Sequence, residues 1–301
     1  MIGRIALFAL IGLILLPLAA VGIAYYRSPP SALDLIDRAW PSAAKRVGTD
    51  LPYLPGKRHS LDIWDVPGGK SPKPVLIFWY GGGWVKGSKE DYGFAARAYA
   101  AKGYLVVVPD YRLVPEVRFP AFVQDGAAAV KWVEANIARY GGDPQRIAFA
   151  GHSAGAHTAI MLATDPRYLR AAGVDPKVVF GAVGLSGPYD FYPFTGRAIA
   201  AMAGVDYRLT QPVLLATRDT PPLMLVTGTE DTTVRPKNAR NLARRLGELG
   251  APAVLKEYPG LNHEDIVVAL SRPFRGKGDV LDASTAFLDR YSGIRAPSQA
   301  K

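Results

Sequence analysis

Residues 147–163 read IAFAGHSAGAHTAIMLA and combine a short apolar run, a serine between glycines and a stretch of small residues. The apolar run predicts a buried strand and the small residues predict a helix. Gly151 and Gly155 permit a tight strand-to-helix turn that lifts the hydroxyl of Ser153 above the sheet. Because a serine hydroxyl is a weak nucleophile until a base takes its proton, this turn predicts a nucleophile whose partners lie elsewhere in the chain.

Strands and helices alternate on both sides of this turn. Continuous apolar runs are typical of strands that are buried on both faces. Further strands are expected over residues 61–66, 75–80, 104–109, 178–185, 223–228 and 253–258, and helices over 92–102, 123–140, 235–249 and 279–291. The alternation predicts the α/β class, with a mostly parallel central sheet and helices on both faces.

Composition narrows the function classes. The chain has 301 residues, of which 49% are apolar and 21% charged, which excludes a wholly disordered protein. It has no cysteine, which excludes disulfides, thiolate metal sites and a cysteine nucleophile. The net charge is +10, but the basic residues are scattered and the densest group, within 235–245, lies on a predicted helix as a solvated face. We therefore expect no nucleic-acid partner.

The N-terminus is not expected to belong to the fold. Residues 5–24 carry no charge and are almost all apolar, and twenty helical residues span about 30 Å, the thickness of the bilayer's hydrocarbon. Residues 1–27 are therefore predicted to be a membrane anchor, with a cleaved secretory signal as the alternative. Either segment would bring the chain to a membrane and leave the folded domain outside the cytoplasm.

Residues 28–50 are interpreted as a linker or a leading helix. The catalytic domain is expected to begin near Leu51 and to extend over 51–295. Residues 187–221 interrupt the alternation of strands and helices, and they are either a cap insertion over the site or a structural excursion.

A second motif, YGGGW, follows the first buried strand at residues 80–84. A glycine run leaves backbone N–H groups uncovered, so that they can approach a substrate oxyanion. Gly82 and Gly83 are predicted to donate to it together with the N–H of Ala154. The aromatic side chains expected to contact the substrate are Tyr80, Trp84 and Tyr189.

The chain has four histidines that could serve as the base, at positions 59, 152, 157 and 263. His59 is expected at the surface, His152 should point away from the adjacent serine, and His157 should pack beneath the site. His263 remains, in a loop after a late strand, and an imidazole with an ordinary pKa near 6.5 can accept and return a proton at neutral pH.

Asp231 follows the strand at 223–228 and is predicted to orient the base, with its neighbour Glu230 as the alternative. The order Ser153, Asp231, His263 is that of the α/β-hydrolases and not that of the two well-known serine-protease folds.

With these motifs, the chain from about residue 51 to residue 291 resembles the α/β-hydrolase superfamily. It is most similar to the bacterial esterase and lipase group with an H-G-G-G-W oxyanion loop, which includes feruloyl-esterase-like domains. The resemblance is also carried by KRHSLDIW at 57–64, PDYRL at 109–113, and FP at 119–120 leading to Asp125 and Trp132.

The resemblance implies the nucleophile, acid and base at Ser153, Asp231 and His263, and the oxyanion glycines at Gly82 and Gly83. The chain departs from the family at Tyr80, where the family usually has the histidine that holds the loop. Asp110, Arg112 and Asp125 are interpreted as structural ties around this loop.

The expected function is hydrolysis of small-molecule carboxylic esters through an acyl-enzyme, which requires no metal and no cofactor. Two alternatives remain open at this point. The same residues could cleave an amide or a formamide, or the chain could be a non-catalytic, membrane-tethered binding protein.

Overall fold

A single mixed sheet forms the centre of the protein. The computed structural model describes residues 19, 21–23, 28–69 and 72–293. In the described part, the sheet has eight strands in the order β1-β2-β4-β3-β5-β6-β7-β8. Their bounds are β1 Lys45–Pro52, β2 Ser60–Asp65, β3 Lys73–Trp79, β4 Leu105–Pro109, β5 Gly142–His152, β6 Val179–Leu185, β7 Leu223–Gly228 and β8 Ala253–Tyr258. The β1–β2 and β2–β4 pairs are antiparallel, and the other pairs are parallel.

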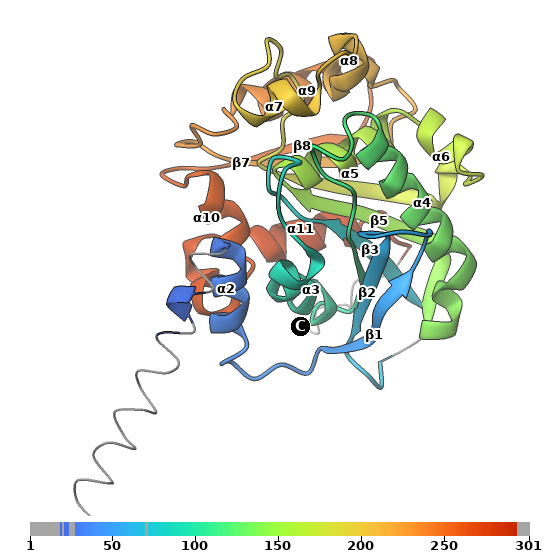
Figure 1. Cartoon of the computed structure of the whole chain (residues 1–301), viewed down its shortest axis with the longest axis vertical. Helices are drawn as coiled ribbons and strands as arrows, with labels where there is room; N and C mark the ends of the chain where they lie inside the picture. Colours follow the sequence, from blue (N-terminus) through green and yellow to red (C-terminus); the bar gives the residue numbers. More distant parts are fainter. Residues whose placement is uncertain (1–18, 20, 24–27, 70–71, 294–301) are drawn as a thin grey trace, which may run out of the picture.

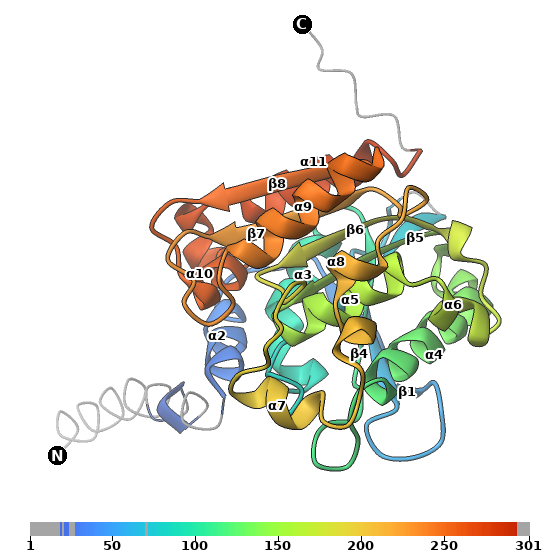
Figure 2. The ribbon, with the colours of Figure 1, turned by 90° about the horizontal axis from the view of Figure 1, so that it is seen from above.

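Helices cover both faces of the sheet, as the sequence predicts. The longer ones are α2 Pro29–Asp37, α3 Gly93–Ala100, α4 Ala121–Asn136, α5 Ala154–Thr164, α9 Lys237–Leu249 and α11 Val280–Asp289. Figures 1 and 2 show α3 and α11 on one face and α4, α5 and α9 on the other. The central strands β3 and β4 are mostly apolar and wholly buried. This arrangement confirms the α/β class and the mostly parallel sheet.

The fold begins earlier than the sequence indicates. We expected it to start near Leu51, but β1 already begins at Lys45 and pairs with β2. The strand was missed because it lies at the edge of the sheet, where most of its side chains are exposed and give no apolar alternation.

The leading helix α2 is fixed to the body of the protein by buried ion pairs. The guanidinium of Arg97, on α3, lies 2.7 Å from Asp34 and 2.8 Å from Asp37. Arg272 approaches Asp37 from the other side at 2.7 Å. Burial disfavours the charged carboxylate of Asp37, but the hydrogen bonds from Arg272 and Arg97 outweigh it and lower the pKa below its ordinary value. Residues 29–37 are therefore an integral part of the domain.

The predicted membrane segment, residues 5–24, falls mostly outside the described residues. Among the residues that are described, none of the helices combines the length and the apolarity needed to cross a bilayer.

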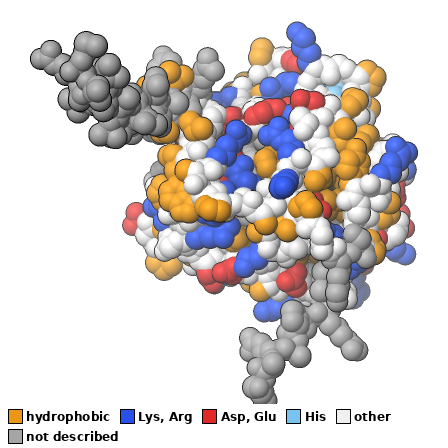
Figure 3. Space-filling view, turned by 90° about the horizontal axis from the view of Figure 1, so that it is seen from below, with side chains coloured by type: hydrophobic (Ala, Val, Ile, Leu, Met, Phe, Trp, Pro, Cys, Tyr) orange, Lys and Arg blue, Asp and Glu red, His pale blue; other side chains and the backbone are white. Residues whose placement is uncertain are grey.

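The later cations of the basic group on α9 are solvated, as predicted. Arg240 forms an ion pair with Glu257, and Arg244 and Arg245 both approach Glu248. On the face of the molecule shown in Figure 3, Lys and Arg side chains are likewise interspersed with acidic and apolar ones.

Candidate active site

Ser153 occupies a strained turn between β5 and α5. Its backbone has φ 55° and ψ −121°, a conformation that a residue with a side chain rarely adopts. Gly155 allows the helix to approach the sheet this closely, because a Cβ there would overlap the backbone carbonyl of Trp79 on β3. The turn holds the serine side chain at the carboxyl edge of the sheet, as the sequence predicts.

Ser153, His263 and Asp231 form a continuous hydrogen-bonded chain. His263 Nε2 lies 2.9 Å from Ser153 Oγ, and His263 Nδ1 lies 2.8 Å from Asp231 Oδ2. Asp231 and His263 are only 2% and 4% exposed, so water does not compete for these bonds. The sequence-predicted residues, which lie far apart in the chain, are therefore brought together.

The carboxylate of Asp231 is itself held in place. Its Oδ1 accepts hydrogen bonds from the backbone N–H groups of Thr233 at 3.0 Å and Val234 at 2.7 Å. Oδ2 is thereby directed at the imidazole and fixes a tautomer with the proton on Nδ1 and a free lone pair on Nε2 facing the serine. Glu230, the alternative orienter, is exposed and makes no such contact with His263.

The glycine loop lies over the same cavity as the serine. Gly82 has φ 134° and Gly83 φ 63°, a conformation that glycine adopts without strain. Both glycines and Ala154 line the cavity beside Ser153. Trp84 also lines it and stacks on Phe191, and its contact with substrate stays a prediction.

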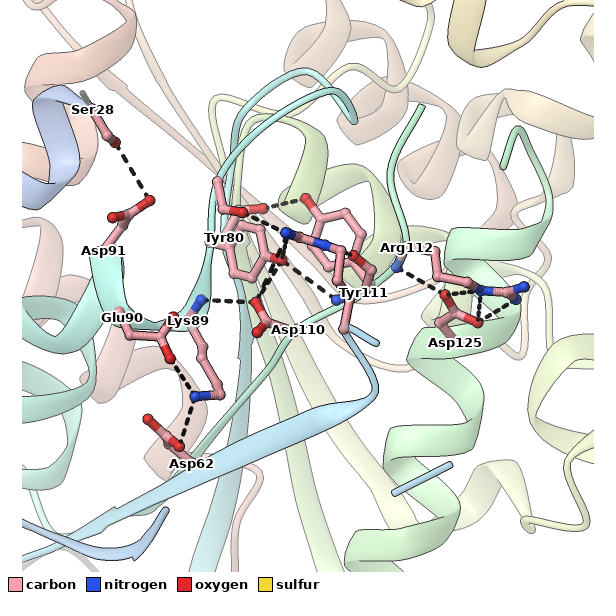
Figure 4. Close-up of polar contacts among 12 residues, drawn as sticks. Ser28, Asp62, Tyr80, Lys89, Glu90, Asp91, Asp110, Tyr111, Arg112 and Asp125 are labelled. Carbon is pink, nitrogen blue, oxygen red and sulfur yellow. Dashed lines mark hydrogen bonds and ion pairs between the residues drawn. The ribbon is translucent and has the colours of Figure 1, made fainter. Parts of the chain in front are cut away.

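Tyr80 does not contact this cavity. Its side chain is wholly buried, so the prediction that it meets substrate is wrong; the strand end directs it into the protein. Its hydroxyl donates to Asp110 Oδ1 at 2.8 Å and accepts a hydrogen bond from Arg58 Nη2 at 2.8 Å (Figure 4). Burial, together with the charge of Asp110, raises the pKa of Tyr80 well above its ordinary value, so the hydroxyl keeps its proton.

The groups around Tyr80 also hold the far end of the glycine loop. Arg58 Nη2 donates to the carbonyl of Gly87 at 2.6 Å, and the N–H of Lys89 donates to Asp110 Oδ1 at 3.0 Å. The hydroxyl of Tyr111 donates to the carbonyl of Tyr80 at 2.8 Å. The loop from Tyr80 to Lys89 is thus fixed at both ends, and the family's histidine is replaced by a tyrosine that braces the loop.

The ties expected at Arg112 and Asp125 are also present. Arg112 Nη2 lies 2.7 Å from Asp125 Oδ1, and the backbone N–H of Arg112 donates to Oδ2 at 3.0 Å. His59 is not at the surface as expected. It is only 8% exposed, because its Nε2 lies 3.3 Å from Asp125 and its Nδ1 lies 2.7 Å from the carbonyl of Pro55.

Tyr189 is a second correction. It was expected to contact substrate, but it is wholly buried and does not line the cavity. Its backbone N–H donates to Oδ1 of Asn238, which draws this part of the chain against α9. Two later aromatic residues of the same segment, Phe191 and Tyr192, line the cavity instead.

The two histidines near the serine have structural surroundings. His152 does not turn away from the triad: its ring centre lies 4.9 Å from that of His263. Burial and the neighbouring His263 lower its pKa well below the ordinary value. His157 is buried as predicted, with Nε2 donating to the carbonyl of Thr210 at 2.9 Å, and burial lowers its pKa to about 4. Neither ring is placed to take the proton of Ser153.

The cavity above Ser153 has a volume of about 1230 Å³. One wall consists of residues 188, 191–193 and 195–198, from the first part of the predicted cap insertion. Another part of the wall is largely apolar and comes from α2, α3, the helix α10 (His263–Val268) and the 3-10 helix η5 (Arg272–Lys277). Its apolar side chains include Leu33, Ile36, Phe94, Val267 and Phe274. Sequence reasoning missed the contribution of α2, for which the only signal was the apolar spacing within 33–40.

Comparisons with known proteins identify the family of this chain. Residues 61–246 match the family BD-FAE. The chain is 34% identical over 229 residues to "Esterase LipC" of Mycobacterium tuberculosis, covering 67% of this chain and 56% of that protein. It is 30% identical over 261 residues to "Isoprenylcysteine alpha-carbonyl methylesterase ICME" of Arabidopsis thaliana, covering 79% and 61%. The chain thus spans little more than half the length of these relatives.

Solved structures share the fold. An inhibited esterase B from Lactobacillus rhamnosis superposes with a TM-score of 0.75 at 20% identity, covering 92% of this chain and 96% of that one. A truncated carbohydrate esterase from gut microbiota gives a TM-score of 0.72 at 19% identity, covering 83% and 96%. The fold is therefore that of the α/β-hydrolase esterases, and the chain belongs to the BD-FAE family.

Proposed function

We propose that the protein is a serine hydrolase that cleaves carboxylic esters of small molecules through an acyl-enzyme on Ser153. The observation that carries this proposal is the hydrogen-bonded chain from Ser153 through His263 to Asp231, at 2.9 Å and 2.8 Å, on the floor of a large cavity. The names of the relatives, which include an esterase and a methylesterase, support the same class of reaction.

In the first half of the reaction, Ser153 Oγ attacks the carbonyl carbon of the ester while its proton passes to His263 Nε2. The charge of Asp231 stabilises the imidazolium. The carbonyl oxygen, now negative, accepts hydrogen bonds from the N–H groups of Gly82, Gly83 and Ala154. The bond to the alkoxy oxygen then breaks, and the alcohol leaves with the proton that His263 returns.

In the second half, a water molecule takes the place of the alcohol. It attacks the acyl carbonyl while His263 Nε2 accepts one of its protons, and the same N–H groups bind the oxyanion. The bond to Ser153 Oγ breaks, the serine regains its proton, and the carboxylic acid leaves.

The proposal is tested by hydrolysis of a series of 4-nitrophenyl esters with acyl chains of rising length, by wild type, Ser153→Ala and Asp231→Asn. We expect no turnover by Ser153→Ala and a loss of about 10⁴-fold in kcat for Asp231→Asn, because the amide holds the wrong tautomer of the imidazole. Circular dichroism should show that both variants stay folded. Ester turnover by folded Ser153→Ala at the wild-type rate would overturn the proposal.

Ester and amide cleavage are separated in the same experiment. An aryl formamide is offered in parallel with its ester counterpart, and we expect kcat/KM to be higher for the ester. A faster reaction with the formamide would reassign the substrate class while leaving the triad in place.

A further inference from the structure

Basic side chains gather around the opening of the cavity. Lys86, Arg197, Arg235 and Lys237 all line it and are all exposed. They come from three separate segments: the glycine loop, the start of the helix α7 (Arg197–Ala201), and the approach to α9. In the part of the chain that the structure describes, no carboxylate forms an ion pair with any of these four side chains.

Other charges at the cavity do not offset this group. A fifth cation, Lys277, is already paired with Asp265 at 2.7 Å. Two carboxylates also line the cavity: Asp91, which accepts hydrogen bonds from Ser28 and Ser31, and Glu264. The unpaired charge around the opening therefore remains predominantly positive.

The side chain of Arg197 lies beside Gly83. A Cβ placed on Gly83 would lie 2.6 Å from Arg197 Cδ and 3.5 Å from its Nη1. The side chain of Arg197 thus lies directly on the glycine loop, and both line the cavity that holds Ser153. A guanidinium in this position has five donors, which suit two parallel hydrogen bonds to a carboxylate or a phosphate.

Like charges that share one opening repel one another, and an anionic ligand relieves that repulsion. The same charges attract anions to the cavity and raise the rate of association, an effect that salt screens. The arrangement therefore favours a substrate with a negative charge close to its ester group.

We propose that the preferred substrates are esters that carry an anionic group, and that Arg197, supported by Lys86, Arg235 and Lys237, binds that group. The inference rests on the ester hydrolysis proposed above and specifies its substrate class. The negative charge can belong to the acyl part or to the alcohol part, because the cations surround the opening on more than one side.

The test compares anionic esters with neutral esters of similar size. Monoethyl adipate and ethyl hexanoate differ by a carboxylate on the acyl part, and 4-acetoxybenzoate and 4-acetoxybenzamide differ by a carboxylate on the alcohol part. The measured quantity is the ratio of kcat/KM for the anionic ester to kcat/KM for the neutral ester, with acid release followed by pH-stat. Comparing this ratio between variants cancels the intrinsic reactivity of the esters.

Arg197→Gln should lower the ratio about three- to fivefold for at least one pair, the size expected for a single partly exposed ion pair. Added NaCl should lower the ratio of the wild type in the same direction. The matched control is Arg218→Gln, which removes the same charge from an exposed residue that does not line the cavity, and it should leave the ratio unchanged.

The outcomes separate this inference from the proposed function. If both pairs give the same ratio in wild type and Arg197→Gln while the esters are still hydrolysed, the substrate class is wrong and the esterase remains. An equal fall of the ratio in Arg218→Gln would also overturn the inference, because the ratio would then depend on net charge and not on the position of Arg197. If the wild type hydrolyses none of the four esters, the proposed function fails as well.

Discussion

Replacing Tyr80 by phenylalanine tests how the glycine loop is held. The substitution removes one hydroxyl and keeps the ring, so that its stacking on Tyr111, with ring centres 4.6 Å apart, is preserved. Three hydrogen bonds disappear: the one that Tyr80 donates to Asp110 at 2.8 Å, and the ones that it accepts from Arg58 at 2.8 Å and from the backbone N–H of Tyr111 at 3.4 Å. Asp110 keeps the hydrogen bond from the N–H of Lys89 and the ion pair with Arg58 at 3.9 Å.

The expected cost follows from burial and charge. Hydrogen bonds to charged groups contribute about 1.5–3 kcal/mol, and the hydroxyl is wholly buried, so Tyr80→Phe should lower the free energy of unfolding by about 2 kcal/mol. For a chain of this size, that corresponds to a decrease in Tm of about 3 °C. A loop that is held less firmly also positions its N–H groups less accurately for the oxyanion. We therefore expect kcat to fall about tenfold with little change in KM.

Tyr104→Phe is the matched control. Tyr104 is also buried, and its hydroxyl donates to Asp289 at 2.6 Å, but it does not line the cavity. Thermal denaturation and 4-nitrophenyl ester kinetics on both variants separate stability from catalysis. We expect both to lose stability and only Tyr80→Phe to lose kcat. If the two variants lose stability alike and neither loses kcat, the hydroxyl of Tyr80 does not position the loop.

Three further predictions concern the cavity wall and buried charge. Ile36→Trp should place a larger side chain in the apolar wall and narrow the cavity, so kcat/KM should fall more for long-chain 4-nitrophenyl esters than for the acetate. An unchanged dependence of kcat/KM on acyl chain length would remove α2 from the binding site. Asp37→Asn should lower the free energy of unfolding by about 3 kcal/mol, measured in urea, because Arg97 and Arg272 would lose a buried partner; a loss below 1 kcal/mol would contradict this. Burial lowers the pKa of His157 to about 4 in the folded protein, against 6.5 in the unfolded chain. As the pH falls from 6.5 to 4, the unfolded chain binds a proton at this residue before the folded protein does, so the free energy of unfolding should fall by about 3 kcal/mol. His157→Gln should remove most of that slope, and an equal slope in the variant would contradict the assignment.

The centre of the fold was predictable because burial leaves a plain signal. Strands such as β3 and β4 are covered on both faces and therefore consist of continuous apolar residues. The edge strand β1 is paired on one side only and largely exposed, so its sequence carries no comparable pattern. This difference in burial explains why the other strands of the sheet were predicted and the edge strand β1 was missed.

The triad residues were predictable because their chemistry and their chain order restrict the choice. The residues that line the cavity were not predictable, because the lining depends on the direction in which each side chain points. Tyr80 and Tyr189 are aromatic residues beside site motifs, yet both point into the protein. The wall formed by α2 depends on ion pairs such as Arg97–Asp34, between residues 63 positions apart, which no local pattern reveals.

The most direct measurement is covalent labelling of the intact protein with a fluorophosphonate, followed by peptide mass spectrometry. A serine whose proton is taken by His263 should react at a single site, so we predict one adduct, on the peptide that contains Ser153, and none in Ser153→Ala or after denaturation. Labelling of folded Ser153→Ala to the wild-type extent, or no adduct in the active wild type, would contradict the assignment of this serine as the nucleophile.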